Sequence, residues 1–281
     1  MIKTRKAEME DLDDLLAIEA SAIPGYGYMY DDRFFFLENQ GNTGEMTIAY
    51  VDDVAAGMGQ YSVMPDGSGW LEILRVKKEY QRMGVGTEIY KRYMELADET
   101  HAPSIAMFTG RRNIGSKHLA EEYGFHLAAA YLENALDMKE REVTPVEGFR
   151  LVEDLEEAKR LIDEPGKGWG RFMALNRTFM HYGDDLYKYL IGRKMIWTDG
   201  ESVLVLGCRM LEERGWFIGM MNGDLKKCQA FAEYKVKEKG LPKLTVSFPP
   251  EREDLIEFVQ SAGYTQAGEL IVMEWIRDEN S

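Results

Sequence analysis

The chain opens with two patterns that follow one another directly. Residues 2–7 alternate apolar and polar side chains, which is typical of a short strand, and residues 10–16 place carboxylates at the start of a predicted helix. The same succession returns at residues 148–152 and 153–157. The chain is therefore expected to begin a strand and a helix twice, once in each half.

A second pair of similar segments lies near the end of each half. Residues 122–125 (Glu-Tyr-Gly-Phe) precede a strand-like stretch at 128–138, and residues 261–264 (Ser-Ala-Gly-Tyr) precede another at 266–275. In each pair, glycine ends a predicted helix and a strand follows. Two matches in the same order indicate an internal repeat with its boundary near residues 140–147.

The rest of the first half alternates between strand and helix patterns. Asp52-Asp53 is a turn signal between two apolar runs, which predicts a hairpin. A later helix joins two strands, and such a crossover favours parallel pairing. Strands are predicted at 45–51, 54–63, 70–77 and 104–108, and helices at 87–99 and 113–123. The expected fold class is α/β (α+β), in two tandem domains at 1–143 and 144–281.

Composition and net charge limit the classes of partner that the chain is expected to bind. The 281 residues are 45% hydrophobic and 30% charged, as in ordinary globular proteins. A net charge of -15 disfavours nucleic acid and anionic membrane and favours a cationic small molecule. Cys208 and Cys228 lack companions at metal-ligand spacing, so no metal site and no disulfide are expected. Without a signal-peptide or membrane-spanning pattern, the chain is expected to be cytoplasmic.

A glycine-containing turn carries the strongest chemical signal. The strand at 70–77 leads into Gln81-Arg82-Met83-Gly84-Val85-Gly86, and a helix follows. Backbone N–H groups at such a helix start suit a pyrophosphate, and glycines let the anion approach closely. An ordinary strand-to-helix turn is the alternative. A third glycine and a Gly-Lys-Ser/Thr motif are both missing, which argues against dinucleotide-binding and P-loop sites.

Residues 76–87 (Val-Lys-Lys-Glu-Tyr-Gln-Arg-Met-Gly-Val-Gly-Thr) resemble the acyl-CoA-binding segment of the GNAT superfamily of N-acetyltransferases. The family pattern is Gln/Arg-x-x-Gly-x-Gly/Ala after a strand that ends in Val. A later helix led by Asn113 and closed by Gly124-Phe125 also matches, so the resemblance covers roughly residues 1–140. It implies tandem GNAT-like domains, each with a mixed, mostly antiparallel sheet flanked by helices.

The resemblance also implies acetyl-CoA as co-substrate and no metal. Backbone N–H groups from Arg82 to Thr87 would hold the pyrophosphate, and main-chain groups near Leu74 and Val76 would pair with the pantetheine. The implied cofactor-binding residues are Leu74, Val76, Gln81, Arg82, Met83, Gly84, Val85, Gly86, Thr87, Asn113 and Ser116. An acceptor amine would attack the thioester directly, which fits the lack of a nucleophile motif.

Two catalytic candidates follow. A protonated amine must lose a proton before it attacks, and Glu72 shares strand parity with Leu74 and Val76, so it is the candidate base. A solvated strand residue is the alternative role. The family's thiolate-protonating tyrosine would fall at Ala120, which leaves Tyr123 as the candidate acid, with core packing as its alternative. A thiol with a pKa near 8.5 can also leave as thiolate.

The family places its acceptor site in the connection between its first two helices. In this sequence that connection contains Tyr26, Tyr28 and Asp32, which are candidates to bind the cationic acceptor amine, because aromatics beside carboxylates attract cations. Core packing of the tyrosines is the alternative.

The second half carries Gly-Met-Met-Asn-Gly-Asp at 219–224 where the cofactor turn should come. Asp224 is a good helix N-cap, but its carboxylate would compete with a phosphate. This half is therefore interpreted as a degenerate copy without CoA. It could shape the acceptor pocket, hold a homodimer together or bind an effector.

The function predicted is transfer of an acetyl group from acetyl-CoA to a primary amine. A catalytically silent CoA-binding or sensing protein is one alternative. An acyltransferase that uses another acyl-CoA is the other.

Overall fold

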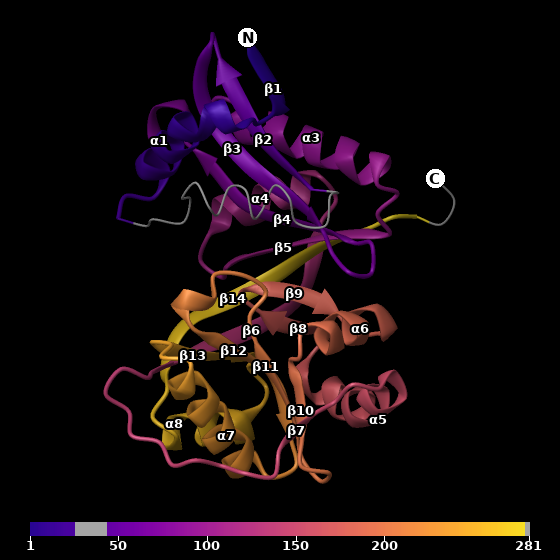
Figure 1. The fold of residues 1–281 in the computed structure, drawn as a ribbon. Helices are drawn as coiled ribbons and strands as arrows, with labels where there is room; N and C mark the ends of the chain where they lie inside the picture. Colours follow the sequence, from indigo (N-terminus) through magenta and orange to yellow (C-terminus); the bar gives the residue numbers. More distant parts are fainter. Residues whose placement is uncertain (26–43, 279–281) are drawn as a thin grey trace. The chain divides into compact units, whose positions relative to one another are not determined.

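The computed structural model describes residues 1–25 and 44–278 (Figure 1). Contacts divide the chain into two compact units. The first unit holds residues 1–107, 113–126 and 273–281, and the second holds 108–112 and 127–272. The two units are thus not separated by one cut of the chain, and domains at 1–143 and 144–281 stay a prediction.

The first unit is built on a sheet whose strands follow chain order. Strands β1 to β4 pair antiparallel, and β4 and β5 pair parallel, as the crossover helix between them requires. The strands are β1 (Ile2–Lys6), β2 (Glu45–Val51), β3 (Val54–Val63), β4 (Gly69–Val76) and β5 (Ser104–Gly110). The helices are η1 (Met9–Asp11), α1 (Leu12–Ala22), η3 (Lys78–Tyr80), α3 (Val85–Glu99) and α4 (Ile114–Glu122). These elements confirm the succession expected from the hydrophobic pattern.

The second unit is also built on a mostly antiparallel sheet, with its strands in the order β6, β13, β12, β11, β10, β7. Among these six strands, β12 and β13 pair parallel and the other neighbours pair antiparallel. Its strands are β6 (His126–Asp137), β7 (Arg150–Leu151), β8 (Phe172–Leu175), β9 (Thr178–His181), β10 (Ile196–Thr198), β11 (Val203–Gly207), β12 (Trp216–Asn222), β13 (Lys243–Phe248) and β14 (Thr265–Ile276). Its helices are α5 (Leu155–Gly166), η4 (Lys167–Trp169), α6 (Asp184–Gly192), η5 (Glu212–Arg214), α7 (Leu225–Glu238) and α8 (Glu253–Ser261). Strand β14 belongs to the second unit up to Val272 and to the first from Met273.

The internal repeat is visible in two helix endings that share a left-handed glycine and a backbone bond. Helix α4 ends before Gly124 at a φ of +81°, and α8 ends before Gly263 at +89°. The next residue turns back in both cases: the Phe125 N–H donates to the Ala120 carbonyl at 3.1 Å, and the Tyr264 N–H donates to the Val259 carbonyl at 3.0 Å. Left-handed glycines of this kind end helices because they have no Cβ to clash.

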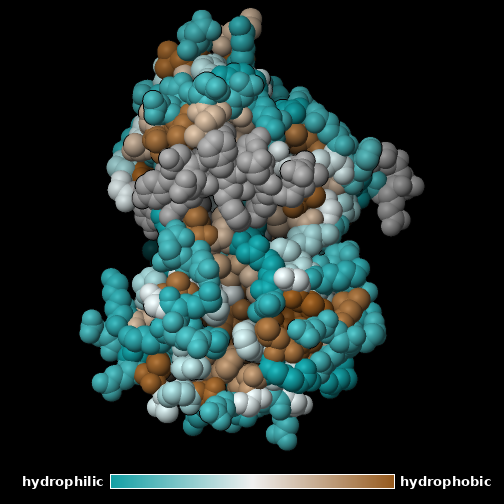
Figure 2. Space-filling view, viewed as in Figure 1, coloured by the Kyte–Doolittle hydropathy of each residue, from teal (hydrophilic) through white to brown (hydrophobic). Residues whose placement is uncertain are grey.

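Each unit buries an apolar core, and hydrophilic residues cover much of the face in Figure 2. In the first unit, helix α3 approaches β3 closely at Gly57 and Gly59, where any Cβ would collide with Val85, Ile89 or Tyr93. Glycine is needed at both positions because the helix leaves no room for a side chain. The start of α3 is thereby held over the sheet next to the turn that leaves β4.

Candidate active site

The turn between β4 and α3 presents the start of a helix without a side-chain cap. Gly84 is the residue before α3, in the left-handed region at φ +90°, and none of the described side chains caps this helix. Arg82 is also left-handed, at φ +64°. The first N–H groups of a helix have no partner within it, and the helix dipole makes this end positive. The turn therefore has the donors and the field that an anion needs.

Glycine is favoured at positions 84 and 86 of the turn for two different structural reasons. At Gly84, a Cβ would have space, with Ile2 Cδ1 at 3.6 Å, but the positive φ would strain any other residue. At Gly86, a Cβ would lie 3.2 Å from Leu119 Cδ2 of α4. Gly86 therefore allows α4 to pack on α3, a role that sequence analysis did not predict.

Strand β4 is irregular just before this turn. Gln60 pairs with Glu72 and Met58 pairs with Arg75, so Gly59 alone faces two residues of β4. Ile73 takes a φ of +57° at this β-bulge. The register of β4 with β5 runs from Gly69 to Leu71. The main chain that follows the bulge includes Leu74 and Val76, which the sequence analysis predicts to pair with the pantetheine.

Side chains of the chain itself hold two carbonyls of this stretch. Arg75 Nη1 donates to the Leu74 carbonyl at 2.9 Å, and Gln81 Nε2 donates to the Val76 carbonyl at 3.2 Å. Gln81 thus ties the turn to the end of β4. Both bonds come from partly or fully exposed side chains, which can move aside for a ligand that makes the same contacts.

Glu72 lies on β4 immediately before the bulge and is half-buried. Its Oε1 accepts a hydrogen bond of 2.8 Å from Ser62 Oγ on β3. The bulge that follows interrupts the strand parity assumed between Glu72 and the later residues Leu74 and Val76, so the role of Glu72 as the base stays a prediction. Sequence analysis missed Ser62 and its neighbour Gln60, although polar residues at every second position of an otherwise apolar strand were a readable signal.

Tyr123 lies at the end of α4 with its hydroxyl engaged. Its Oη donates to the Thr87 carbonyl at 2.8 Å, and its ring centroid lies 5.1 Å from that of Tyr90. Burial raises the pKa of the Tyr123 phenol, so it keeps its proton at neutral pH. Ala120, at the position of the family's tyrosine, is completely buried. Packing is the role visible for Tyr123, and its acid role stays a prediction.

Asn113 caps helix α4: its Oδ1 accepts from the Ser116 N–H at 3.2 Å. The two residues predicted on the far side of the pantetheine are thus brought together, and Asn113 is exposed. The acceptor candidates Tyr26, Tyr28 and Asp32 lie outside the described residues.

Tyr93 is another residue that sequence analysis did not assign to the site. Its side chain is fully buried on α3, and its Oη makes no hydrogen bond in the described part of the chain. A Cβ on Gly59, opposite the bulge, would lie 1.9 Å from this oxygen. Burial raises the pKa of Tyr93, with the Glu72 carboxylate as a further cause. The bulge therefore has a neutral phenol beneath it.

The corresponding turn of the second unit, from β12 to α7, is closed. The Asp224 side chain accepts from the Lys227 N–H at 3.0 Å, and Ser202 Oγ accepts from the Asp224 N–H at 3.1 Å. The expected N-cap role of Asp224 is confirmed. Trp169 Nε1 donates to the Met221 carbonyl on β12 at 3.0 Å, so this strand also has a partner from its own unit.

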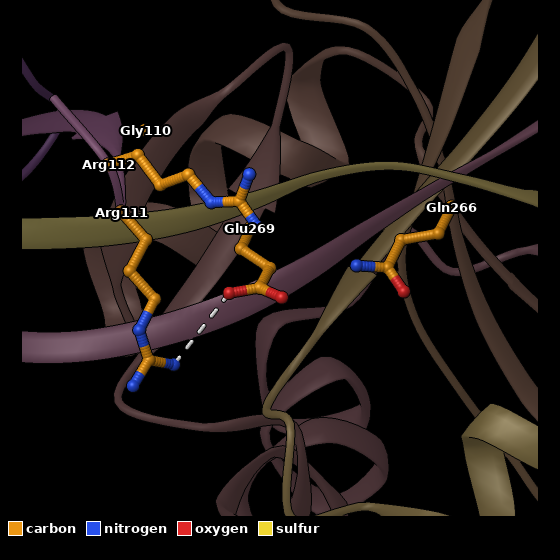
Figure 3. A pocket seen from close by; sticks show the side chains of 5 residues that line it. All are labelled: Gly110, Arg111, Arg112, Gln266 and Glu269. Carbon is orange, nitrogen blue, oxygen red and sulfur yellow. Dashed lines mark ion pairs between the residues drawn. The ribbon is translucent and has the colours of Figure 1, made fainter.

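A recess of about 340 Å³ lies in the second unit, lined by Gly110, Arg111, Arg112, Gln266 and Glu269 (Figure 3). Arg111 Nη1 lies 3.9 Å from Glu269 Oε2. No residue of the predicted site lines this recess. Across residues 1–25 and 44–278, no group of three or more His, Cys, Asp or Glu is placed to hold a metal ion. No helix in that part of the chain is long and apolar enough to cross a bilayer.

Residues 11–125 match the acetyltransferase (GNAT) family. No curated protein sequence matches the chain significantly.

The solved structures that resemble nearly the whole chain in fold include the following three. A GCN5-related N-acetyltransferase from Sphaerobacter thermophilus is 13% identical, with 98% of this chain and 95% of that one covered and a TM-score of 0.65. A tandem GNAT protein from the clavulanic acid biosynthesis pathway is 12% identical, with 98% of each chain covered and a TM-score of 0.65. A glucosamine N-acetyltransferase region of a fungal β-N-acetylglucosaminidase is 14% identical, with 98% of this chain and 38% of that one covered and a TM-score of 0.68. Residues 11–125 therefore form an acetyltransferase domain of the GNAT family, in a chain with the fold of tandem GNAT proteins.

Proposed function

We propose that the first unit transfers the acetyl group of acetyl-CoA to a primary amine. The observation that carries this proposal is the uncapped start of α3 behind the left-handed Gly84, within the segment that matches the GNAT family. A phosphate group would satisfy the helix donors that no described side chain takes.

The residues of the turn fit an acyl-CoA. N–H groups from Arg82 to Thr87 would hold the pyrophosphate, and the exposed Arg82 would add a positive charge. Main-chain groups of Leu74 and Val76 would pair with the pantetheine as an added strand does, in place of the side-chain bonds from Arg75 and Gln81. Asn113 and Ser116 would line its other side. Acetyl-CoA would supply the activated acetyl thioester.

The side chains at the bulge would handle the proton. Glu72 would accept a proton from the ammonium form of the acceptor, directly or through water, and so free the nitrogen lone pair for attack. The C–N bond would then form while the C–S bond breaks, with the sulfur leaving as thiolate. Tyr123 could protonate that sulfur only after releasing the Thr87 carbonyl, so solvent is the simpler proton source.

The acceptor proposed is a small cationic amine. The chain carries a net charge of -15, which attracts cations by long-range electrostatics. Tyr26, Tyr28 and Asp32 would contact it through cation–π and ionic interactions. The second unit would not bind CoA, because Asp224 and Trp169 already use the groups that a cofactor would need.

Calorimetric titration of the full chain with acetyl-CoA, followed by a turnover assay on a panel of amines, tests the proposal. One acetyl-CoA per chain and release of CoA with at least one amine are expected. No binding to the intact chain would overturn it.

A silent CoA-binding or sensing protein is the second candidate. It is favoured by Ala120 at the tyrosine position and by the engagement of the Tyr123 hydroxyl with Thr87. Stoichiometric binding without turnover on any amine would select this alternative.

A further inference from the structure

We propose that Ser62 positions Glu72 for proton transfer, through a directed chain of hydrogen bonds that runs from Gln60 to Ser62 to Glu72; this inference rests on the proposed function. Ser62 and Gln60 lie on β3 and Glu72 lies opposite Gln60 on β4. Ser62 would be a positioning residue, since its hydroxyl contacts the base and not the reacting atoms.

The direction of this chain follows from a backbone carbonyl. Gln60 Nε2 lies 2.8 Å from the Tyr61 carbonyl and 3.4 Å from Ser62 Oγ. A carbonyl can only accept, so the amide nitrogen must be the atom that faces Tyr61. The Ser62 oxygen therefore receives a hydrogen from Gln60, which leaves its own hydrogen for Oε1 of Glu72 at 2.8 Å.

The burial of Gln60 and Ser62 indicates that this chain of hydrogen bonds has a functional role. Gln60 and Ser62 have no exposed surface at all, whereas their neighbours on β3 are apolar or glycine apart from Tyr61. Placing an amide and a hydroxyl inside a sheet costs free energy unless they are hydrogen-bonded. Bonds to an ionised acceptor are stronger than neutral ones, and chains of such bonds reinforce one another.

This chain of hydrogen bonds ends at Glu72, the proposed base. Glu72 is the last residue of β4 in regular register with β3 before the bulge at Ile73. A glutamate has three side-chain torsions, and an unrestrained carboxylate would sample several positions. The bond from the buried Ser62 restrains this carboxylate, which lies on β4 two residues before Leu74, where the pantetheine would pair. Small displacements of a catalytic group lower the rate strongly, so this restraint should appear in kcat.

The chain offers a matched control for this bond. Ser68 is also buried in the first unit, and its Oγ donates to a carboxylate, Asp66 Oδ1, at 2.6 Å. That bond lies in the turn between β3 and β4, away from the bulge. Ser62→Ala and Ser68→Ala therefore delete the same kind of bond, one at the proposed base and one elsewhere.

We expect Ser62→Ala in the full chain to lower kcat about 10- to 100-fold, with the calorimetric acetyl-CoA affinity unchanged. The KM for the amine should change less than kcat, because the Ser62 hydroxyl contacts the base and not the acceptor. Ser62→Thr, which keeps the hydroxyl, should recover most of the rate. Gln60→Met should act in the same direction with a smaller effect, and Ser68→Ala should leave kcat unchanged.

Each result decides between the inferences. If the parent enzyme turns over amines and Ser62→Ala and Gln60→Met keep its kcat, the positioning role is wrong and the proposed function stands. If Ser62→Ala does not fold, Gln60→Met and Ser62→Thr carry the same comparison. An unchanged kcat in Gln60→Met would then overturn the inference. If the parent protein acetylates no amine, the proposed function fails and the positioning role fails with it.

Discussion

The β4–α3 turn of the first unit and the β12–α7 turn of the second unit are two versions of one structure. Both join a strand with a parallel neighbour to a long helix. Gly84 leaves the first helix without a side-chain cap, whereas Asp224 caps the second by accepting from the Lys227 N–H. The residue before the helix thus decides whether the helix start can take an external anion or has satisfied its own donors.

The strands that enter these turns differ in the same sense. Glu72 lies three residues past the first residue that pairs with β5, and Gly219 lies three residues past the first that pairs with β13. A Cβ on Gly219 would lie 3.1 Å from Met173 Sδ. By this count along the parallel pairing, the second unit has a glycine packed against Met173 where the first unit has a carboxylate. If the first unit alone is an enzyme, changes at matched positions should separate the two units.

The largest expected effect is at Glu72. Glu72→Gln keeps the shape and the ability to accept from Ser62 but cannot take the proton of the acceptor, so kcat should fall about 100- to 10,000-fold. Acetyl-CoA affinity should stay within a factor of about two, as measured by calorimetry. Glu95→Gln on the exposed side of α3 is the control, since its side chain is 63% exposed. An unchanged kcat at saturating substrates would remove Glu72 from the mechanism.

Gly84→Asp should weaken acetyl-CoA binding about 100-fold, because it strains the left-handed residue and places a carboxylate at the start of α3. Gly67→Asp is the matched control: its φ is +81°, close to the +90° of Gly84, and its Cβ would touch nothing within 4 Å. Titration of both variants separates the ligand contact from backbone strain. Equal loss in the two variants, or full affinity in Gly84→Asp, would place the phosphate site elsewhere.

The sequence predicted the elements of the first unit because its apolar periods are regular. The strands at 45–51 and 54–63 have their predicted ends, since the Asp52-Asp53 turn between them adopts the positive φ values of a tight hairpin. The glycine turn and its helix were also recognisable, because left-handed and anion-binding positions demand particular residues.

Other features depend on contacts that no local pattern encodes. The bond from Ser62 to Glu72 requires the cross-strand register of β3 and β4, and that register shifts by one residue at the bulge. From the sequence, Gly86 was predicted to let a phosphate approach the backbone. Its contact with Leu119 could not be predicted, because that contact depends on how α4 packs. The closure of the second turn by Trp169 joins residues that are 52 positions apart.

Acid should lower the stability of both units through one buried carboxylate in each. Arg5 donates to Asp11 at 2.6 and 2.7 Å and holds the pKa of that carboxyl at about 2, and the bond from Lys227 holds the pKa of Asp199 at about 2. A pKa lowered on folding gives stability that is present above the unfolded value of about 3.9 and is lost as the pH falls towards 2. Because both cations are partly exposed, about 1 kcal/mol per pair is expected.

Urea unfolding at pH 7 and pH 3 measures this loss. Asp199→Asn should flatten the pH dependence by the share of one pair, and Asp53→Asn, in an exposed turn, should leave it unchanged. An unaltered slope in Asp199→Asn would show that the pair with Lys227 contributes nothing to acid sensitivity.

The smallest expected effect is at Asp224, and it separates an open helix start from a working site. Asp224→Ala removes the cap of α7 and should lower the free energy of unfolding by about 1 kcal/mol in urea titrations. It should not create a second acetyl-CoA site, because Trp169 still bonds to the Met221 carbonyl and Met173 still packs against Gly219. Asp154→Ala is the control, since Asp154 caps α5 in the same way by accepting from the Glu157 N–H at 2.8 Å. Both variants should lose similar stability and bind one acetyl-CoA per chain. A second bound acetyl-CoA in Asp224→Ala would mean that the cap alone had kept the second unit from binding the cofactor, and that the contacts of Trp169 and Met173 are no barrier.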